Sequence, residues 1–417
     1  MVDDRSQSAE DGTPDLEHFR EAARSFLREH LPLKQESDDQ WALPFFTDVA
    51  EAEQHFLRGR RWQKTLYEHG FAGLTYPSEF GGRGFDARYE GVFRDELLLF
   101  DIPRALVAAT ISMLGPTLLK FGTDEQCRRL LPRLLSGDDA WCQLFSEPGA
   151  GSDLATLACR AERDGDRFIV NGQKVWTSGA QFCTHGMLLA RTNPDVPKHK
   201  GITFFLFDLG SPGVDVRPLF QANGSADFSE VFMTDVVVPM EAVLGSVDEG
   251  WPVVRAVLSN EASFIGGGGA GEPSEPTNEK LVRLAREFGK AEDPVIRQDL
   301  VRHFSRERLV SVMGARIQAS IRNGGPPAVD PSLLKLFTTA NRVLSGDLAM
   351  AIAGPSAMIT VDTRSEWLQA ELTGRYVFSI GGGTSEVQRN NLAERSLGLP
   401  REPTNDRAIP WRKIPRG

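Results

Sequence analysis

Two phrases near the middle of the chain combine residue types that could hold a flat ligand with a polar edge. Residues 141–153, WCQLFSEPGAGSD, are polar and rich in glycine, which lets the backbone approach a ligand closely. Residues 171–179, NGQKVWTSG, predict a turn and a strand that ends in an indole and two hydroxyls. An aromatic face beside hydroxyl groups suits a planar ring and its hydrogen-bonding edge. The two phrases together therefore indicate a binding site for a planar ligand.

The segments on either side of these phrases have helical patterns. From residue 15 to about residue 140, apolar residues recur at spacings of three and four, as at Leu16 and Phe19. The same spacing returns after the central segment, where two separate helices are expected over Pro331–Leu344 and Gly346–Ala353. A glycine-rich stretch at Gly266–Thr277 fits the pattern G-x-G-x-x-G, but it lacks the strand–turn–helix context of a dinucleotide site and is predicted to be a mobile loop.

The central segment has the short period of a β-sheet. Asp164-Gly165 and Asn171-Gly172 are dipeptides typical of hairpin turns, and short runs rich in β-branched and aromatic residues flank them. The predicted fold is α+β and mostly α: an N-terminal helical domain, a central antiparallel β-barrel-like domain and a C-terminal helical bundle. The expected boundaries are a disordered leader at 1–14 and domains at 15–140, 141–245 and 246–417.

Composition limits the classes of function. The chain has 417 residues, 25% of them charged, and a formal net charge of −10, which argues against a partner that is nucleic acid or an anionic membrane. No uninterrupted apolar run reaches the roughly 18 residues that a membrane span needs. The acidic leader has no apolar core of a signal peptide. We therefore expect a soluble, cytoplasmic protein. No metal site is expected, because the histidines are scattered and the cysteines lack metal-ligand spacing; these are Cys127, Cys142, Cys159 and Cys183.

The two central phrases resemble the flavin-binding segments of the acyl-CoA dehydrogenase family. A third phrase, residues 379–389 (SIGGGTSEVQR), resembles the last flavin-contacting segment of that family, and its continuation at 393–401 matches as well. The resemblance covers about residues 15–400, and it implies the same order of helices, sheet and helices. It also implies FAD as cofactor, bound through Phe145, Ser146, Trp176, Thr177, Ser178, Gly383, Thr384 and Glu386. Gln143 is not counted among these residues, because the family usually has an aromatic residue there.

The family removes a proton alpha to a thioester carbonyl, which requires a carboxylate base in a site that excludes water. Many members place this glutamate directly before the Gly-Thr pair, where this chain has Gly382. A second subset places it on the first helix after the β domain, in a Leu-x-x-Glu-Arg phrase that reads here as LSNEA, residues 258–262. By this resemblance Glu261 is the candidate catalytic base. The alternative is a solvated or capping glutamate at the start of a helix.

The same resemblance suggests the substrate. Ser152 would face the CoA part of an acyl-CoA thioester, and a backbone N–H near Gly382 would bind the thioester carbonyl. Gly381 and Gly382 would leave room for an acyl group bulkier than a straight chain. The reaction implied is formation of a trans-2,3-double bond, with an electron-transfer flavoprotein as electron acceptor. A flavin monooxygenase or oxidase of the same fold, and a non-catalytic partner subunit, are the alternatives.

Two departures concern the half-site that a subunit of this family lends to its neighbour. An Arg-x-x-Phe-Gly phrase normally reaches the neighbour's flavin pyrophosphate, but here Ala285 stands at the arginine position. A Gln-x-x-Gly-Gly phrase normally contacts the neighbour's adenosine, and residues 351–355 read AIAGP instead. Some bacterial members, including steroid side-chain dehydrogenases, pair two unlike subunits. The expected assembly is a heterotetramer with a related subunit or a homotetramer with looser adenosine contacts.

Overall fold

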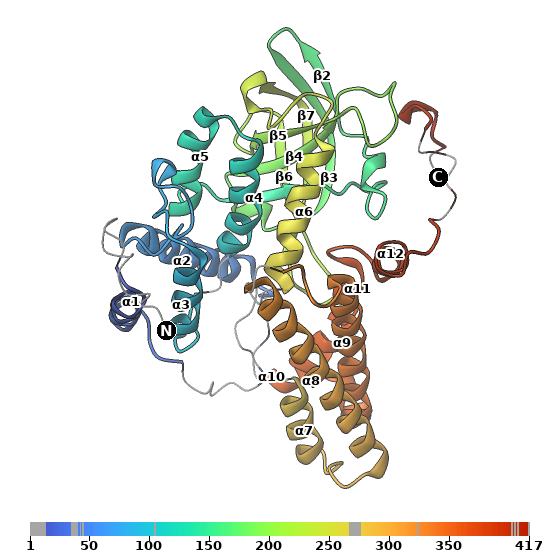
Figure 1. Cartoon of the computed structure of the whole chain (residues 1–417). Coiled ribbons are helices and arrows are strands. Elements are labelled where there is room, and N and C mark those ends of the chain that lie inside the picture. The colour runs from blue at the N-terminus through green and yellow to red at the C-terminus, as the bar shows by residue number, and fades with distance from the viewer. Residues whose placement is uncertain are drawn as a thin grey trace.

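The computed structural model describes residues 14–34, 41, 43, 46–103, 106–266, 277–322, 325–401, 403, 406 and 408–415. The N-terminal part is helical (Figure 1), with α1 (Leu16–His30), α2 (Val49–Glu68), α3 (Ala87–Leu97), α4 (Leu106–Phe121) and α5 (Asp124–Ser136). Side-chain caps fix where these helices begin. The Asp15 carboxylate accepts from the N–H of Glu17, and Thr123 and Gln126 form a reciprocal capping box at α5. The predicted leader lies outside the described residues except for Pro14.

The central part is a seven-stranded curled sheet in the order β1-β4-β2-β3-β7-β6, with β5 paired to β4. Its strands are β1 (Trp141–Leu144), β2 (Arg160–Asp164), β3 (Arg167–Ser178), β4 (His185–Arg191), β5 (Ile202–Asp208), β6 (Val214–Leu219) and β7 (Phe228–Pro239). The pairs are antiparallel except for β1 with β4 and one contact between β2 and β4, which are parallel.

The turn prediction at Asp164-Gly165 is confirmed, because Asp164 pairs with Arg167 across the β2–β3 hairpin. The prediction at Asn171-Gly172 is wrong, since both residues lie inside the continuous strand β3. The glycine is needed there for close packing. A Cβ on Gly172 would lie 2.7 Å from Sγ and 2.8 Å from Cα of Cys159.

The C-terminal part is a helical bundle. It comprises α6 (Trp251–Gly266), α7 (Thr277–Glu287), α8 (Pro294–Arg322), α9 (Pro331–Ala353), α10 (Thr363–Gly374), α11 (Val377–Ile380) and α12 (Ser385–Asn391). The two helices expected between Pro331 and Ala353 are one continuous helix. Gly346 does not break it; a Cβ there would meet the backbone oxygen of Glu371 at 2.9 Å, so the glycine permits close approach of α10. The glycine-rich stretch between α6 and α7 lies outside the described residues.

One hydrophobic core joins α4, α6 and one face of the sheet. It includes Leu114 and Leu118 of α4, Val254 and Val257 of α6, and Phe204 of β5, all fully buried. In Figure 1, α4 and α6 run side by side against the sheet, and the remaining C-terminal helices extend away from it. The predicted fold class is therefore confirmed. Within the described residues, no helix has the length and apolarity that crossing a lipid bilayer requires.

Candidate active site

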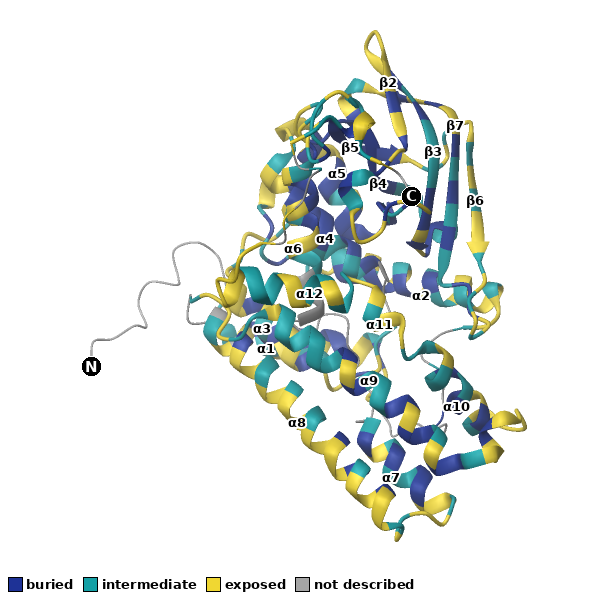
Figure 2. Ribbon diagram, turned by 90° about the vertical axis from the view of Figure 1, so that its right-hand side faces the viewer, coloured by how far each residue is buried: buried dark blue, intermediate teal, exposed yellow. Residues whose placement is uncertain are grey.

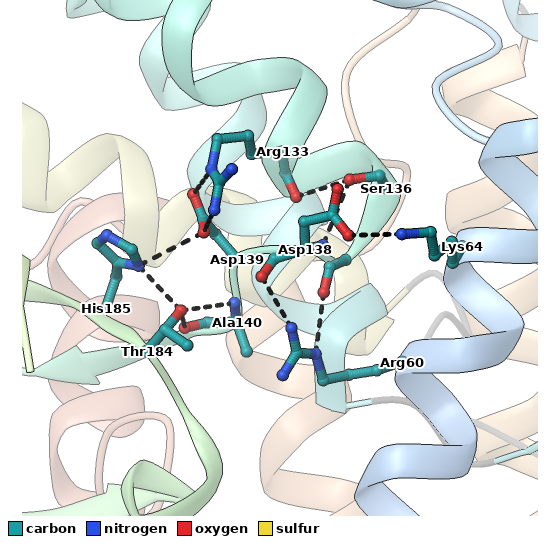
Figure 3. Close-up of polar contacts among 10 residues, drawn as sticks. Arg60, Lys64, Arg133, Ser136, Asp138, Asp139, Ala140, Thr184 and His185 are labelled. Carbon is teal, nitrogen blue, oxygen red and sulfur yellow. Dashed lines mark hydrogen bonds and ion pairs between the residues drawn. The ribbon is translucent and has the colours of Figure 1, made fainter. Parts of the chain in front are cut away.

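The strand β1 is held at its N-terminal end by charged side chains of the helical part (Figure 3). The Arg133 guanidinium on α5 donates to both carboxylate oxygens of Asp139, at 2.7 and 2.6 Å. Asp139 is buried and lies two residues before β1. Thr184 Oγ1 accepts from the N–H of Ala140 at 3.0 Å, and the His185 ring stacks on Trp141. These contacts fix the direction in which β1 enters the site.

After β1, the chain is fastened to β3 by a buried ion pair. Lys174 is fully buried, and its Nζ donates to Glu147 Oε1 at 2.7 Å and to the carbonyl of Phe145 at 3.0 Å. The Glu147 carboxylate also accepts from the N–H groups of Ala158 and Cys159. In addition, Val175 donates its N–H to the carbonyl of Ser146 at 3.0 Å. The two phrases singled out in the sequence are therefore joined through Glu147 and Lys174, which the sequence reasoning did not select although both stand inside the phrases.

The end of β3 has the features of a ligand-facing edge. Trp176 has φ +60°, an uncommon conformation for a bulky residue, and its side chain is 57% exposed. It sits where the β3–β7 register shifts between Lys174 and Thr177. Thr177 is fully buried, and its Oγ1 has no hydrogen-bond partner among the described residues. A strained exposed indole beside an unsatisfied buried hydroxyl is what a binding site for a ring with a polar edge requires.

Glu261 lies on α6, ten residues into the helix, rather than at a helix start. The amide of Gln143, on β1, donates to Glu261 Oε2 at 3.3 Å. Burial raises the pKa of the Glu261 carboxyl, while the bond from Gln143 and the positive charge of Lys335 oppose this shift. The capping alternative for Glu261 is therefore wrong. Gln143, which the comparison of motifs set aside, is the residue that contacts the candidate base.

The neighbouring helix α4 fixes this part of α6. Asn260 Nδ2 donates to the carbonyl of Met113 and to Thr117 Oγ1, both at 3.2 Å. Both acceptors lie on α4, so the residue directly before Glu261 is tied to a second helix. The carboxylate therefore rests on a rigid element rather than on a loop, as a catalytic group requires.

The triple-glycine turn, residues 381–383 directly after α11, contains two of the predicted site residues, Gly382 and Gly383. Gly382 and Gly383 have φ of +64° and +87°, the left-handed region that favours glycine. Among the described residues, no acceptor pairs with the N–H of Gly382, so this group is available to a ligand oxygen. Thr384 caps α12 by accepting from the N–H of Val387, and Glu386 pairs with Arg389 at 3.1 Å.

The predicted site residues thus fall into two groups that β1 connects. Phe145, Ser146, Trp176 and Thr177 lie where the loop after β1 meets β3, whereas Glu261 lies against Gln143 within β1. Ser152 and Ser178 are exposed, and among the described residues neither forms a hydrogen bond or ion pair with the second group. Ala285 is fully buried and Ala351 is exposed; these are the two positions that depart from the family motifs expected to contact a neighbour.

Comparison with known proteins decides the family. The chain matches the acyl-CoA dehydrogenase N-terminal domain over residues 13–138, the middle domain over 142–236 and the C-terminal domain over 248–397. It belongs to the acyl-CoA dehydrogenase family. It is 38% identical over 395 residues to acyl-CoA dehydrogenase IpdE1 of Mycobacterium tuberculosis (strain ATCC 25618 / H37Rv), covering 93% of this chain and 99% of the relative.

Solved structures agree with this assignment. The Tcur3481-Tcur3483 steroid ACAD superposes with a TM-score of 0.73 at 28% identity, covering 93% of this chain and 98% of that one. The ChsE4-ChsE5 complex from Mycobacterium tuberculosis superposes with a TM-score of 0.69 at 28% identity, covering 94% and 99%. The resemblance stated from the sequence motifs is therefore confirmed, and the chain is an oxidoreductase of the acyl-CoA dehydrogenase class.

Members of this family are flavoproteins, and the residues at the end of β3 fit a flavin. The fit rests on three observations: the unsatisfied Thr177 Oγ1, the exposed and strained Trp176, and the unpaired N–H of Gly382. The buried unsatisfied hydroxyl and the strained indole are costly or unusual in a protein that binds nothing there, and the exposed N–H of Gly382 is open to a ligand. Together they offer a stacking surface, a hydroxyl and a backbone donor for a planar cofactor and its substrate.

Proposed function

We propose that the chain is an FAD-dependent acyl-CoA dehydrogenase that converts an acyl-CoA thioester into the trans-2-enoyl-CoA. The observation that carries this proposal is Glu261, a mostly buried carboxylate held by Gln143 on an α-helix. A base that removes a weakly acidic proton must be fixed, ionised and shielded from water. Phe145, Ser146, Trp176, Thr177, Ser178, Gly383, Thr384 and Glu386 are the residues proposed to hold FAD.

In this mechanism Glu261 takes the proton alpha to the thioester carbonyl. Because burial raises the pKa of its carboxyl, the ionised form is a stronger base than an exposed glutamate. The free N–H of Gly382 is proposed to donate to the thioester oxygen, where negative charge develops as the proton leaves. Ser152 is proposed to contact the CoA moiety. FAD, when bound, supplies the acceptor for the hydride that leaves the beta carbon.

The acyl group is proposed to be bulky, and a steroid-derived acyl group fits best. Gly381 is exposed and has no side chain, whereas the space beside Gly382 is taken by Lys335, whose Nζ would lie 3.1 Å from a Cβ at that position. The similarity to a steroid ACAD supports the same substrate class. The electrons are proposed to pass to an electron-transfer flavoprotein, as in the family in general.

The decisive experiment is an anaerobic titration of the purified, FAD-loaded chain with straight-chain, branched and sterol-derived acyl-CoA esters, followed by loss of flavin absorbance. Wild type should be bleached by at least one ester. Glu261→Gln should lower the bleaching rate roughly a hundredfold to ten-thousandfold, because it removes the base. Glu292→Gln, at an exposed position, is the matched control and should bleach like wild type.

Two outcomes would overturn the proposal. Wild-type rates in Glu261→Gln would show that Glu261 is not the base; the same result in a complex assembled with a partner subunit would favour a non-catalytic role for this chain. Rapid oxygen consumption by the reduced protein, without an enoyl-CoA product, would favour an oxidase or monooxygenase of the same fold.

A further inference from the structure

The three carbonyl groups of the triple-glycine turn all accept hydrogen bonds from side chains. Lys335, on α9, donates from Nζ to the carbonyl of Gly381 and, at 3.0 Å, to that of Gly383. Gln388, on α12, donates to the carbonyl of Gly382 at 3.0 Å. Because a carbonyl and the N–H of the next residue share one peptide plane, these bonds also fix where the N–H groups of the turn point. The N–H of Gly382 is therefore positioned by the bond that Lys335 makes to Gly381.

The same ammonium group occupies the space beside Gly382. A Cβ on that glycine would lie 3.1 Å from Lys335 Nζ, which is closer than ordinary contact. A side chain at position 382 would thus compete with Lys335 for this space. Lys335 therefore lies in part of the space that a glutamate at position 382 would need.

Lys335 also supplies positive charge to Glu261. Burial lowers the pKa of Lys335, and the Glu261 charge opposes this shift; the Lys335 charge in turn lowers the pKa of Glu261 against the effect of burial. Among the described residues of α6 and of α4, β5 and α9, which pack against it, the other cations are Lys120, Arg255 and Arg342. Lys120 and Arg255 line the groove between α4 and α6 together with Asn260, and Arg342 pairs with Glu371. None of the three contributes to the pKa shift of Glu261.

We propose that Lys335 is a positioning residue of this site: its ammonium group holds the triple-glycine turn in place, and its positive charge, on a helix that packs against α6, acts on Glu261. The first role concerns the turn itself and is independent of the reaction. The second role rests on the proposed function, because it gives the base its charge state. Substitutions can separate the two roles, since Lys335→Gln removes the charge but keeps a donor, whereas Lys335→Met removes both.

The first role is tested by hydrogen exchange of the full chain without substrate. The hydrogen bonds from Gly381 N to Val377 O and from Val387 N to Thr384 Oγ1 flank the turn. In Lys335→Met these amides should exchange roughly threefold to tenfold faster than in wild type, because the turn is released. Lys290→Met, at an exposed lysine, should exchange like wild type throughout. Unchanged protection in Lys335→Met would overturn the role in the turn.

The second role is tested by infrared difference spectroscopy against pH, again without substrate. The protonated-carboxyl band that disappears in Glu261→Gln reports the charge of Glu261. In both Lys335→Met and Lys335→Gln, its midpoint should move upward by about one pH unit, while Lys335→Arg should stay near wild type. An unchanged midpoint in Lys335→Met and Lys335→Gln would overturn the electrostatic role.

The outcomes separate this inference from the proposed function. If wild type bleaches with an acyl-CoA ester but the lysine variants show neither effect, only the inference on Lys335 fails. If no ester bleaches wild type, the proposed reaction fails, while the exchange and infrared measurements still decide what Lys335 does.

Discussion

At the scale of single residues, the charge of Glu261 depends on a balance between burial and two neighbours. Burial favours the neutral carboxyl, whereas the Gln143 amide and the Lys335 ammonium favour the carboxylate. A base needs both effects: enough burial to make the carboxylate reactive, and enough stabilisation to keep it ionised at the working pH. Gln143 is the one of these two neighbours that contacts the carboxylate directly.

We expect Gln143→Leu to move the acid limb of flavin reduction to higher pH. The reaction requires ionised Glu261, so its rate rises with pH as the proton leaves, with a midpoint above the ordinary glutamate pKa of 4.5. Loss of the hydrogen bond to the charged form raises this pKa further, by up to about one unit. At pH values well above the midpoint, where Glu261 is ionised in both proteins, the rate should stay close to that of wild type. Pre-steady-state bleaching across pH measures this; an unmoved limb would contradict the role of Gln143.

At the scale of elements, the loop after β1 and the strand β3 form one unit because of the buried pair of Lys174 and Glu147. Removing one partner leaves a charge buried without compensation, which costs about 3–5 kcal/mol. We expect Lys174→Met to lower the unfolding temperature markedly and to reduce the FAD content, because the carbonyl of Phe145 loses its side-chain donor. Thermal unfolding and flavin absorbance measure the two effects.

The double variant Lys174→Met with Glu147→Gln is the informative control for this pair. It leaves no uncompensated charge, so it should recover part of the lost stability. Equal destabilisation by the single and the double variant would show that packing, rather than the ion pair, holds the two phrases together.

The C-terminal bundle contains a second buried polar group, with a consequence for pH stability. His303 is fully buried; Asn341 donates to its Nε2 at 3.2 Å, and its Nδ1 faces Asn278 Oδ1 at 3.4 Å. This pattern fits a neutral ring with its proton on Nδ1. Burial lowers the pKa of His303 to about 4.

Because the folded-state pKa of His303 lies below the unfolded value of 6.5, folding favours the neutral ring. The contribution of His303 to the free energy of unfolding is fully present above pH 6.5. It is lost as the pH falls from 6.5 towards 4, and the loss amounts to up to about 3 kcal/mol. We expect His303→Gln to flatten the dependence of the unfolding free energy on pH in this window. His18→Gln, at an exposed position, should leave the slope unchanged. A slope retained in His303→Gln would assign the acid sensitivity to other groups.

Sequence patterns predicted the order of the elements well, because apolar periodicity reports which face of each element is buried. They failed where a long-range contact overrides a local signal. Gly172 lies within a strand because Cys159 packs closely against it, and Gly346 lies within a helix because α10 packs closely against it. The candidate site followed the same rule. Trp176 and Glu261 stand in recognisable phrases, whereas the contact of Lys335 with a turn 46 residues away has no local signature.

At the scale of the whole molecule, the C-terminal bundle exposes an apolar surface that a solitary chain would not need. Along α8, Val301, Phe304, Leu309 and Val312 are all 45% exposed or more. Figure 2 shows that this helix lies at the edge of the molecule with much of its surface exposed. Several exposed apolar side chains on one face of a helix indicate an association surface, although Ser305 and Arg308 also lie on this face. We expect Phe304→Glu to disrupt assembly, measured by light scattering, while Phe220→Glu, exposed on a loop after β6, should not.

The motifs by which a subunit of this family contacts its neighbour's flavin bear on the identity of the partner. Ala285 is buried in the core of the bundle, so this position presents no charge to a neighbour's flavin; Arg286, one residue on, is exposed. Loss of a charge-assisted phosphate contact costs about 1.5–3 kcal/mol, which weakens FAD binding roughly tenfold or more. We therefore propose a related but different subunit as the partner that supplies an intact half-site.

Flavin stoichiometry tests the unlike-subunit assembly directly. The chain purified alone should hold clearly less than one FAD per chain, because each site would be completed by a half-site that lacks the arginine. Co-expression with the related subunit should give a complex that retains its FAD through gel filtration. The sites in that complex would be unequal, since only this chain's flavin would receive the intact half-site. One FAD in every chain of a homomeric assembly, retained at nanomolar concentration, would rule out the requirement for a second kind of subunit.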